Sequence, residues 1–236
     1  MKREPPNSGI AQRRAARIEG TGANYHDRRE EILTAAVRLF REKGYRRTSL
    51  VDIAEAVGAD RASLYYYFGS KEELLNEAVT PVVLQNTAIA EALRESDEPA
   101  PVKLYQLITG LLTSYAEQYP LLYLYLEENL SHVEQSRQAW ARNMRSVNRR
   151  YISAVEGIIA RGIADGTLLP LADPQILANG LMGMVSWTHR WFNPQRSPAS
   201  ARTIGDAYAH ILIRGIATDD AYASLQSQLH PDQPPS

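Results

Sequence analysis

The sequence predicts an all-α protein. Almost every segment between residues 25 and 228 repeats its apolar side chains with the 3.6-residue period of an amphipathic helix, and no segment alternates as a strand does. Glycines, prolines and N-capping side chains divide this pattern into about nine helices. With 236 residues, 44% of them hydrophobic, the chain can form one or two domains with a sizeable core.

The first three predicted helices lie close together in the sequence, and the second and third are short. Capping side chains mark their starts and glycines mark two of their ends. The predicted limits are Asp27 to Gly44, Thr48 or Ser49 to Gly58, and Asp60 to Phe68. Two short helices joined across a glycine turn are typical of a helix-turn-helix.

The remaining apolar pattern predicts six longer helices. A Ser-Pro or Asp-Pro pair marks the start of the last two, because proline is favoured at the first position of a helix. The six predictions are 72–93, a helix around 104–115, one starting at Pro120, 133–163, one from Asp173 that ends before Pro194, and one from Ser197 that includes 204–215.

Composition divides the chain into four parts. Residues 1–24 and 229–236 are rich in proline and polar side chains, which predicts disordered tails. Residues 25–71 hold the helix-turn-helix, and residues 72–228 are predicted to form a helical bundle for dimerisation and ligand binding.

The near-neutral net charge of −1 conceals an asymmetry. Residues 1–71 contain 14 basic and 9 acidic side chains, a net charge of +5, and the rest of the chain contains 12 and 18, a net charge of −6. A basic head joined to an acidic body is expected when one part of a protein binds a polyanion and the other does not.

Several functional classes are disfavoured. The chain has no cysteine, and the apolar stretch 177–187 is far shorter than the ~20 residues of a membrane span. We therefore expect a cytoplasmic protein. The five histidines are scattered, and only Glu128 and His132 are one helical turn apart, so no catalytic residue, metal or cofactor is expected.

The third predicted helix contains three consecutive tyrosines, Tyr65, Tyr66 and Tyr67. Helical spacing places Leu64, Tyr67 and Phe68 on one face, with Tyr66 pointing away from it. A phenol can bond a phosphate oxygen or lie against a thymine methyl group. The alternative is that the three tyrosines pack against a neighbouring part of the protein.

This region resembles the DNA-binding domain of TetR-family transcriptional regulators. The resemblance covers about 45 consecutive residues, including Glu31-Ile-Leu-Thr-Ala-Ala-Val-Arg-Leu-Phe40, residues 44–54, and Ser63-Leu-Tyr-Tyr-Tyr-Phe-Gly-Ser-Lys-Glu-Glu-Leu74. It implies a homodimeric repressor that reads successive major grooves of a palindromic operator in double-stranded DNA. It also implies a C-terminal domain that holds a small-molecule effector.

The resemblance assigns roles by position. It implies phosphate contacts for Thr48 and Ser49, contacts to base edges or thymine for Arg61, Ala62, Ser63 and Tyr65, and DNA-backbone contacts for Tyr66, Tyr67 and Lys71. The competing hypothesis is a helical protein-interaction module without DNA binding, which would not explain the basic head.

The C-terminal half suggests a lipid-like effector. Residues 187–194, preceded by Gly180 and Gly183, are similar to a segment of TetR regulators that respond to acyl-CoA. The alternatives are that Trp187, Trp191 and Phe192 are interface and core aromatics, and that the effector is a hydrophobic drug or another metabolite. Arg145, in a stripe with Arg142 and Arg149, could meet CoA phosphates, or the stripe could be a solvated surface. The predicted ligand-binding residues are Leu111, Tyr115, Leu122, Tyr125, Leu126, Met144, Arg145, Tyr151, Met182 and Trp187.

Overall fold

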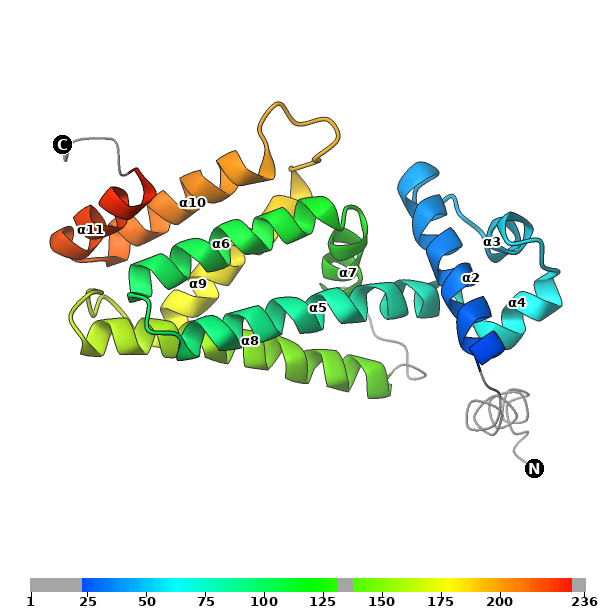
Figure 1. Ribbon diagram of the computed structural model, residues 1–236, viewed down its shortest axis with the longest axis horizontal. Helices are drawn as coiled ribbons and strands as arrows, with labels where there is room; N and C mark the ends of the chain where they lie inside the picture. The colour runs from blue at the N-terminus through cyan, green and yellow to red at the C-terminus, as the bar shows by residue number, and fades with distance from the viewer. Residues whose placement is uncertain (1–22, 131–137, 231–236) are drawn as a thin grey trace. The chain divides into compact units, whose positions relative to one another are not determined.

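The structure is a computed structural model that describes residues 23–130 and 138–230. All regular elements in these two ranges are helices, which confirms the predicted all-α fold (Figure 1). Outside the helices, the described residues contain one β-bridge, between Leu168 and Ala217. None of the described helices has an apolar stretch long enough to span a membrane.

The chain divides into two compact units, Met1–Val79 and Thr80–Ser236. The predicted division after Lys71 falls inside the first unit, because the helix α5 (Lys71–Glu95) runs across the boundary. The first two turns of α5 therefore belong to the smaller unit. Pro81 lies inside α5 just beyond the boundary, where it removes one backbone hydrogen-bond donor from the helix.

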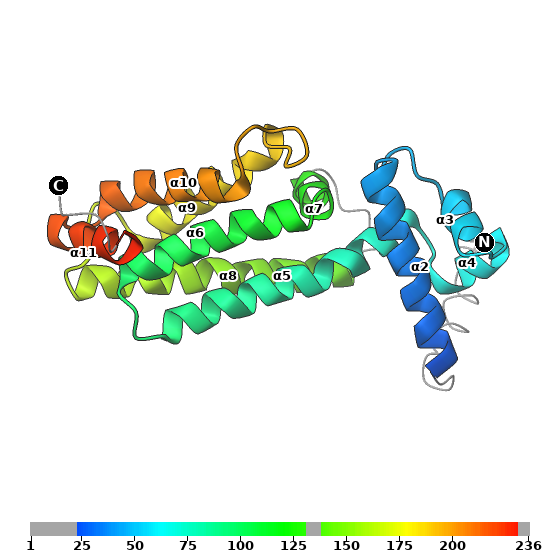
Figure 2. The same cartoon turned by 45° about the horizontal axis from the view of Figure 1, so that its top comes forward.

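The smaller unit consists of α2 (Ala23–Glu42), α3 (Leu50–Ala56), α4 (Arg61–Tyr67) and the start of α5 (Figure 2). Their apolar faces form one core, and burial of each large side chain in it contributes about 1.5–3 kcal/mol. The most deeply buried members are Ile32, Ala36, Phe40, Ile53, Leu64, Phe68 and Leu74.

The turn between α3 and α4 is set by local chemistry. Ser49 caps α3 and forms a capping box with Asp52, and Asp60 caps α4 by accepting a hydrogen bond from the Ser63 amide at 2.7 Å. Gly58 has a φ of +61°, a left-handed conformation that costs other residues about 1–2 kcal/mol. Caps and glycine together fix the predicted helix-turn-helix.

The larger unit contains the rest of α5 and the remaining helices. Within it, α6 and α10 lie side by side along most of their length, as both views show (Figure 1, Figure 2). The other elements are α6 (Ala100–Glu117), α7 (Leu121–Leu130), α8 (Gln138–Ala164), α9 (Pro174–Ser186), the 3-10 helix η2 (Trp187–Arg190), α10 (Ala201–Ile216) and α11 (Asp219–Leu229).

The close approach of α6 and α10 depends on Gly205. A Cβ atom at this position would lie 3.1 Å from the Cα atom of Thr109 and 3.4 Å from its methyl group. Backbone atoms cannot yield as a flexible side chain does, so a larger residue would force the two helices apart.

Several predicted helix limits were wrong. α2 begins at Ala23 rather than Asp27, so the last residues assigned to the N-terminal tail are helical. α10 is capped by Ser200, whose hydroxyl accepts from the Thr203 amide at 3.0 Å, and not by Ser197. The predicted start of a helix at residue 133 lies outside the described residues.

One described helix, α11, was not predicted as a separate element. It begins after Thr218 with two acidic residues in its first turn, which suit the positive end of a helix dipole. Its apolar stripe is weak, and Leu225 is its one fully buried residue. For this reason the described residues contain ten α-helices instead of about nine.

Candidate functional site

The smaller unit presents the outward face of α4. Leu64 points into the core, whereas Arg61, Ala62, Ser63 and Tyr65 are exposed. The Arg61 guanidinium donates to the Tyr65 hydroxyl at 3.3 Å and lies 5.4 Å from the centre of the Tyr65 ring. This contact spans one helical turn, so it holds both side chains along the exposed face of α4.

Tyr66 and Tyr67 are half-buried against α2. The Tyr67 ring stacks on the Tyr25 ring with centroids 5.1 Å apart, and the Tyr66 ring meets the Tyr25 ring edge-on at 5.9 Å. Tyr66, which helical spacing places away from the Leu64 face, is therefore half-buried by an aromatic partner on α2. No local signal in the sequence points to Tyr25, which is far away along the chain.

Arg29 on α2 secures the end of α4, a role that sequence reasoning missed. Its guanidinium donates to the Tyr67 carbonyl at 2.6 Å, pairs with Glu77 of α5, and lies 4.2 Å from the centre of the Phe68 ring. A cation bonded to a terminal carbonyl stabilises the C-terminal end of a helix. Arg29 thus joins α2, α4 and α5 within this unit.

The side chain of Thr48 is buried in the turn before α3. Only 1% of the residue is exposed, and its hydroxyl donates to the Gly44 carbonyl at 2.9 Å. A hydroxyl in this position cannot reach a phosphate, so its predicted role as a phosphate contact is not retained. Ser49, the next residue, is exposed, and its hydroxyl is engaged by Asp52 in the capping box.

Lys71 lies in the first turn of the helix α5 and faces the loop that precedes α3. Its ammonium donates to the carbonyls of Tyr45 at 2.8 Å and Thr48 at 3.0 Å, and lies 4.4 Å from the centre of the Tyr45 ring. These contacts tie α5 to the segment that leads into α3. One of the three ammonium protons is left for an outside acceptor.

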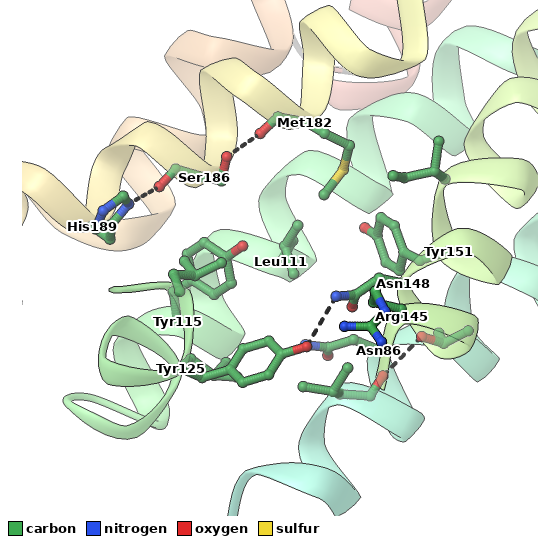
Figure 3. A pocket seen from close by; sticks show the side chains of 15 residues that line it. Asn86, Leu111, Tyr115, Tyr125, Arg145, Asn148, Tyr151, Met182, Ser186 and His189 are labelled. Atoms are coloured by element: carbon green, nitrogen blue, oxygen red, sulfur yellow. Dashed lines mark hydrogen bonds between the residues drawn. The ribbon is translucent and has the colours of Figure 1, made fainter. Parts of the chain in front are cut away.

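The larger unit contains a cavity of about 460 Å³ (Figure 3). This volume lies within the range of about 300–1,000 Å³ for small-molecule sites. Residues from α5, α6, α7, α8, α9 and η2 line it. Most of the predicted ligand-binding residues are among them: Leu111, Tyr115, Leu122, Tyr125, Leu126, Arg145, Tyr151 and Met182.

Two predicted ligand-binding residues do not line the cavity. Met144 is 1% exposed and its sulfur accepts from the Thr80 hydroxyl at 3.8 Å, so it belongs to the core. Trp187 is 61% exposed, and the Arg190 guanidinium lies 5.7 Å from the centre of its ring. Trp191 is also exposed, whereas Phe192 is buried as a core aromatic.

The sequence did not single out seven further lining residues. Several of them lie one or two turns apart on the same helix, but the cavity that they line is formed by the packing of separate helices. They are Val83, Asn86, Thr87, Asn148, Ile152, Ser186 and His189.

The polar groups of the cavity fall into two kinds. Some are engaged by neighbours: Asn148 donates to the Tyr125 hydroxyl and Asn86 to the Ser114 hydroxyl, both at 3.0 Å. Others point into the cavity, notably the hydroxyls of Tyr115 and Tyr151 (Figure 3). Burial raises the pKa of Tyr115 and of Tyr151 well above the usual range, so both remain neutral hydrogen-bond donors.

Arg145 is the one charged side chain among the lining residues that the structure describes. It is exposed, which places its charge where the cavity opens to solvent, and Arg142 and Arg149 on the same helix are exposed as well. An otherwise uncharged, largely apolar lining suits a hydrophobic ligand, with a cation available for an anionic part outside.

The described residues contain no group of three or more histidine and acidic side chains that could hold a metal ion. His132, half of the Glu128–His132 pair, lies outside the described residues.

Known proteins resemble both units of the chain. Residues 32–78 match the bacterial regulatory proteins of the tetR family, and residues 97–216 match the tetracyclin repressor-like C-terminal domain. Over 202 residues the chain is 25% identical to the HTH-type transcriptional repressor KstR2 of Mycobacterium tuberculosis, covering 86% of this chain and 99% of that protein.

Solved structures of TetR-family regulators have the same fold as this chain. The TetR-family regulator PfmR from Thermus thermophilus has a TM-score of 0.66 at 28% identity, covering 78% of this chain and 97% of that one. AibR, solved with isovaleryl coenzyme A and operator DNA, has the same fold, with a TM-score of 0.64 at 21% identity over 79% of this chain and 98% of its own. The chain therefore belongs to the TetR family of DNA-binding transcriptional regulators.

Proposed function

We propose that the protein is a repressor that binds a palindromic operator as a homodimer and is released by a hydrophobic effector, with acyl-CoA as the leading class. The observation that carries this proposal is the exposed face of α4, held on a capped helix-turn-helix, in the same chain as a cavity lined by α5.

The proposed DNA contacts lie on α4 and beside it. The second helix of a helix-turn-helix enters the major groove, where arginine can bond a guanine edge and a methyl group can touch thymine. Arg61, Ala62, Ser63 and Tyr65 are the exposed residues of that helix and take the base-reading role. Ser49, the partly exposed rings of Tyr66 and Tyr67, and the remaining proton of Lys71 take contacts to the DNA backbone.

A second copy of the chain is the proposed partner of α9 and α10. Ile176 on α9 and Ile211 on α10 are 64% and 65% exposed. On α9, Gly180 and Gly183 continue the stripe from Ile176, and a Cβ atom on either glycine would meet no described residue of its own chain within 4 Å. The fold itself therefore does not require glycine there, whereas close contact with another helix would.

The cavity supports a hydrophobic effector with an anionic extension. Its lining is mainly leucine, tyrosine and methionine, and Arg145 supplies a positive charge where it opens to solvent. AibR, which shares the fold, binds isovaleryl coenzyme A. An acyl chain inside the cavity and CoA phosphates beside Arg145 would satisfy both features.

Helix α5 is the proposed link between effector and DNA. Val83, Asn86 and Thr87 of α5 line the cavity, and Lys71 at its start bonds the turn before α3. A ligand that shifts α5 would therefore act on the segment that holds the helix-turn-helix. Coupling of this kind requires that the ligand bind one arrangement of α5 better than another.

Gel-shift titrations test the DNA-binding part of the proposal. The DNA fragment upstream of the gene and a scrambled fragment are compared at two salt concentrations, because several phosphate contacts make affinity fall steeply with salt. Arg61→Ala is expected to lower the preference for the specific fragment by about 1–3 kcal/mol. Arg38→Ala, a control that removes one exposed charge from α2, should keep the preference.

Gel-shift titrations with added ligand, together with thermal denaturation, test the effector. A long-chain acyl-CoA is expected to weaken binding of the upstream fragment and to raise the denaturation midpoint of the protein, whereas CoA alone should do neither. Equal effects of Arg61→Ala and Arg38→Ala would contradict base reading by α4. No effect of saturating acyl-CoA would contradict that effector class.

A further inference from the structure

We propose that Tyr115 and Tyr151 together bind a carbonyl oxygen of the effector, so that the cavity selects ketones, esters or thioesters over hydrocarbons of the same shape. This inference rests on the proposed function of the cavity as the effector site, and it names the chemical group that the site recognises.

The two tyrosines come from different helices and face one space. Tyr115 lies on α6 and Tyr151 on α8, and only 5% and 7% of these residues are exposed. Figure 3 shows the two hydroxyls pointing toward each other across the part of the cavity that Leu111 borders. The site is therefore assembled by packing of α6 and α8.

Neither hydroxyl has a hydrogen-bond partner among the described residues. Tyr125, a third phenol in the lining, differs because Asn148 donates to its oxygen at 3.0 Å. Both hydroxyls face the cavity, so a ligand that fills it without supplying an acceptor would leave them unsatisfied, at a cost of roughly 1–3 kcal/mol, whereas a ligand with an acceptor avoids this cost. Tyr115 and Tyr151 are thus the phenols that a ligand can satisfy.

The chemistry of the pair favours a carbonyl. Both phenols stay protonated because their burial disfavours the phenolate, so each offers one donor. A carbonyl oxygen has two lone pairs and no proton, so it can accept from both phenols at once. A hydrocarbon would leave both hydroxyls unsatisfied, and sites of this kind reject such analogues strongly.

The neighbouring side chains bind the hydrocarbon on either side of the carbonyl. Apolar side chains of the same cavity lining surround the pair: Leu111, Leu122, Ile152 and Met182. Arg145 is left for an anionic substituent where the cavity opens. A carbonyl compound without a charge should therefore bind through the two tyrosines and the apolar lining, without Arg145.

Isothermal titration of the full chain with a matched pair of ligands tests this inference. The probes are 2-octanone and 2-methyl-1-octene, in which a CH₂ group replaces the carbonyl oxygen. The ketone is expected to bind roughly tenfold more tightly than the alkene. Tyr115→Phe and Tyr151→Phe should each weaken ketone binding roughly three- to tenfold and leave alkene binding unchanged or stronger.

Tyr105→Phe is the matched control. Tyr105 is a buried tyrosine of α6 outside the cavity, and its hydroxyl donates to Asp206 at 2.6 Å. This variant should bind both probes as the unmodified protein does. Circular dichroism spectra of all variants establish that a loss of binding does not come from unfolding.

Infrared spectroscopy provides a readout that a purely structural role would not change. The carbonyl stretch of bound, isotope-labelled 2-octanone should shift to lower frequency, because hydrogen bonds weaken the C=O bond. The shift should shrink in each single Tyr→Phe variant and disappear when both are changed.

Equal binding of ketone and alkene, an unshifted carbonyl band, or no ketone binding at saturation would overturn the inference. A ketone that binds through the two tyrosines without altering operator affinity supports the carbonyl site and instead contradicts the proposed effector role of the cavity. The two proposals therefore fail separately.

Discussion

At the scale of single residues, polar side chains of the smaller unit serve its fold before any contact with DNA. Lys71 bonds two carbonyls of the turn before α3, and Arg29 bonds the last carbonyl of α4. The basic charge of residues 1–71 therefore includes cations that hold helix ends in place. Charge counted along the sequence overstates the number available to DNA.

Lys71→Met tests this structural role. The substitution keeps much of the side-chain volume but leaves two carbonyls without their donor, so we expect the free energy of unfolding to fall by about 1–3 kcal/mol. Urea denaturation followed by circular dichroism measures the change. Lys43→Met, which removes an exposed ion pair with Asp52, should change it by less than about 1 kcal/mol.

If Lys43→Met destabilised the protein as much as Lys71→Met, the two hydrogen bonds from Lys71 to carbonyls would have no special role.

The sequence predicted a functional contact for Lys71 but not its bonds to these two carbonyls, because the carbonyls belong to residues more than twenty positions away.

At the scale of elements, helix starts were predicted where the cap is local. Asp60 and Ser49 each bond an amide three residues later, a pattern visible in the sequence. Ser197 and Ser200 both stand near the start of α10. The structure shows that Ser197 accepts a hydrogen bond from the Ala199 amide before the helix, whereas Ser200 accepts one from the Thr203 amide in its first turn. Where two possible N-cap residues lie close together in the sequence, the backbone conformation before the helix determines which one caps it.

The two caps predict a pH dependence. Hydrogen bonds from Ser63 lower the pKa of Asp60, and hydrogen bonds from Ser49, with one from Lys43, lower that of Asp52, both from an ordinary value of 3.8. A carboxyl group with a depressed pKa in the folded state stabilises the fold above its unfolded pKa. This stabilisation is lost as the pH falls through the folded value.

Asp52→Asn and Asp60→Asn retain a capping side chain that cannot titrate. We expect the loss of stability from about pH 4 to pH 2 to be smaller in these variants than in the unmodified protein. Thermal denaturation at each pH measures it, with Asp220→Asn in α11 as the control. Identical pH dependence in all four proteins would show that the caps do not contribute.

At the scale of the whole molecule, the exposed apolar face of α9 and α10 predicts a homodimer. Ile176→Arg combined with Ile211→Arg should convert dimer to monomer in sedimentation experiments, because both residues would be buried between copies. Operator binding should weaken strongly, since a palindrome needs two reading helices.

Gln228→Arg, an exposed position on α11, is the control for added charge and should sediment as the unmodified protein does. A double variant that remains dimeric while its helical spectrum is unchanged would place the dimer contact on a different surface.

The sequence alone determined the all-α class, the helix-turn-helix and most of the residues that line the cavity. Helical period, local caps and glycine turns act within a few residues, and the composition of the larger helices already favours an apolar site. The motif residues 31–74 were also sufficient to indicate the family.

Only the tertiary structure decided which candidates are available to a ligand. Tyr66 is half-buried beside Tyr25, Trp187 is exposed to solvent, and Met144 lies in the core. Tyr115 and Tyr151 face one space because α6 and α8 pack together. Helical period places a side chain on a face of its own helix, whereas contacts between residues distant in the chain determine what that face meets.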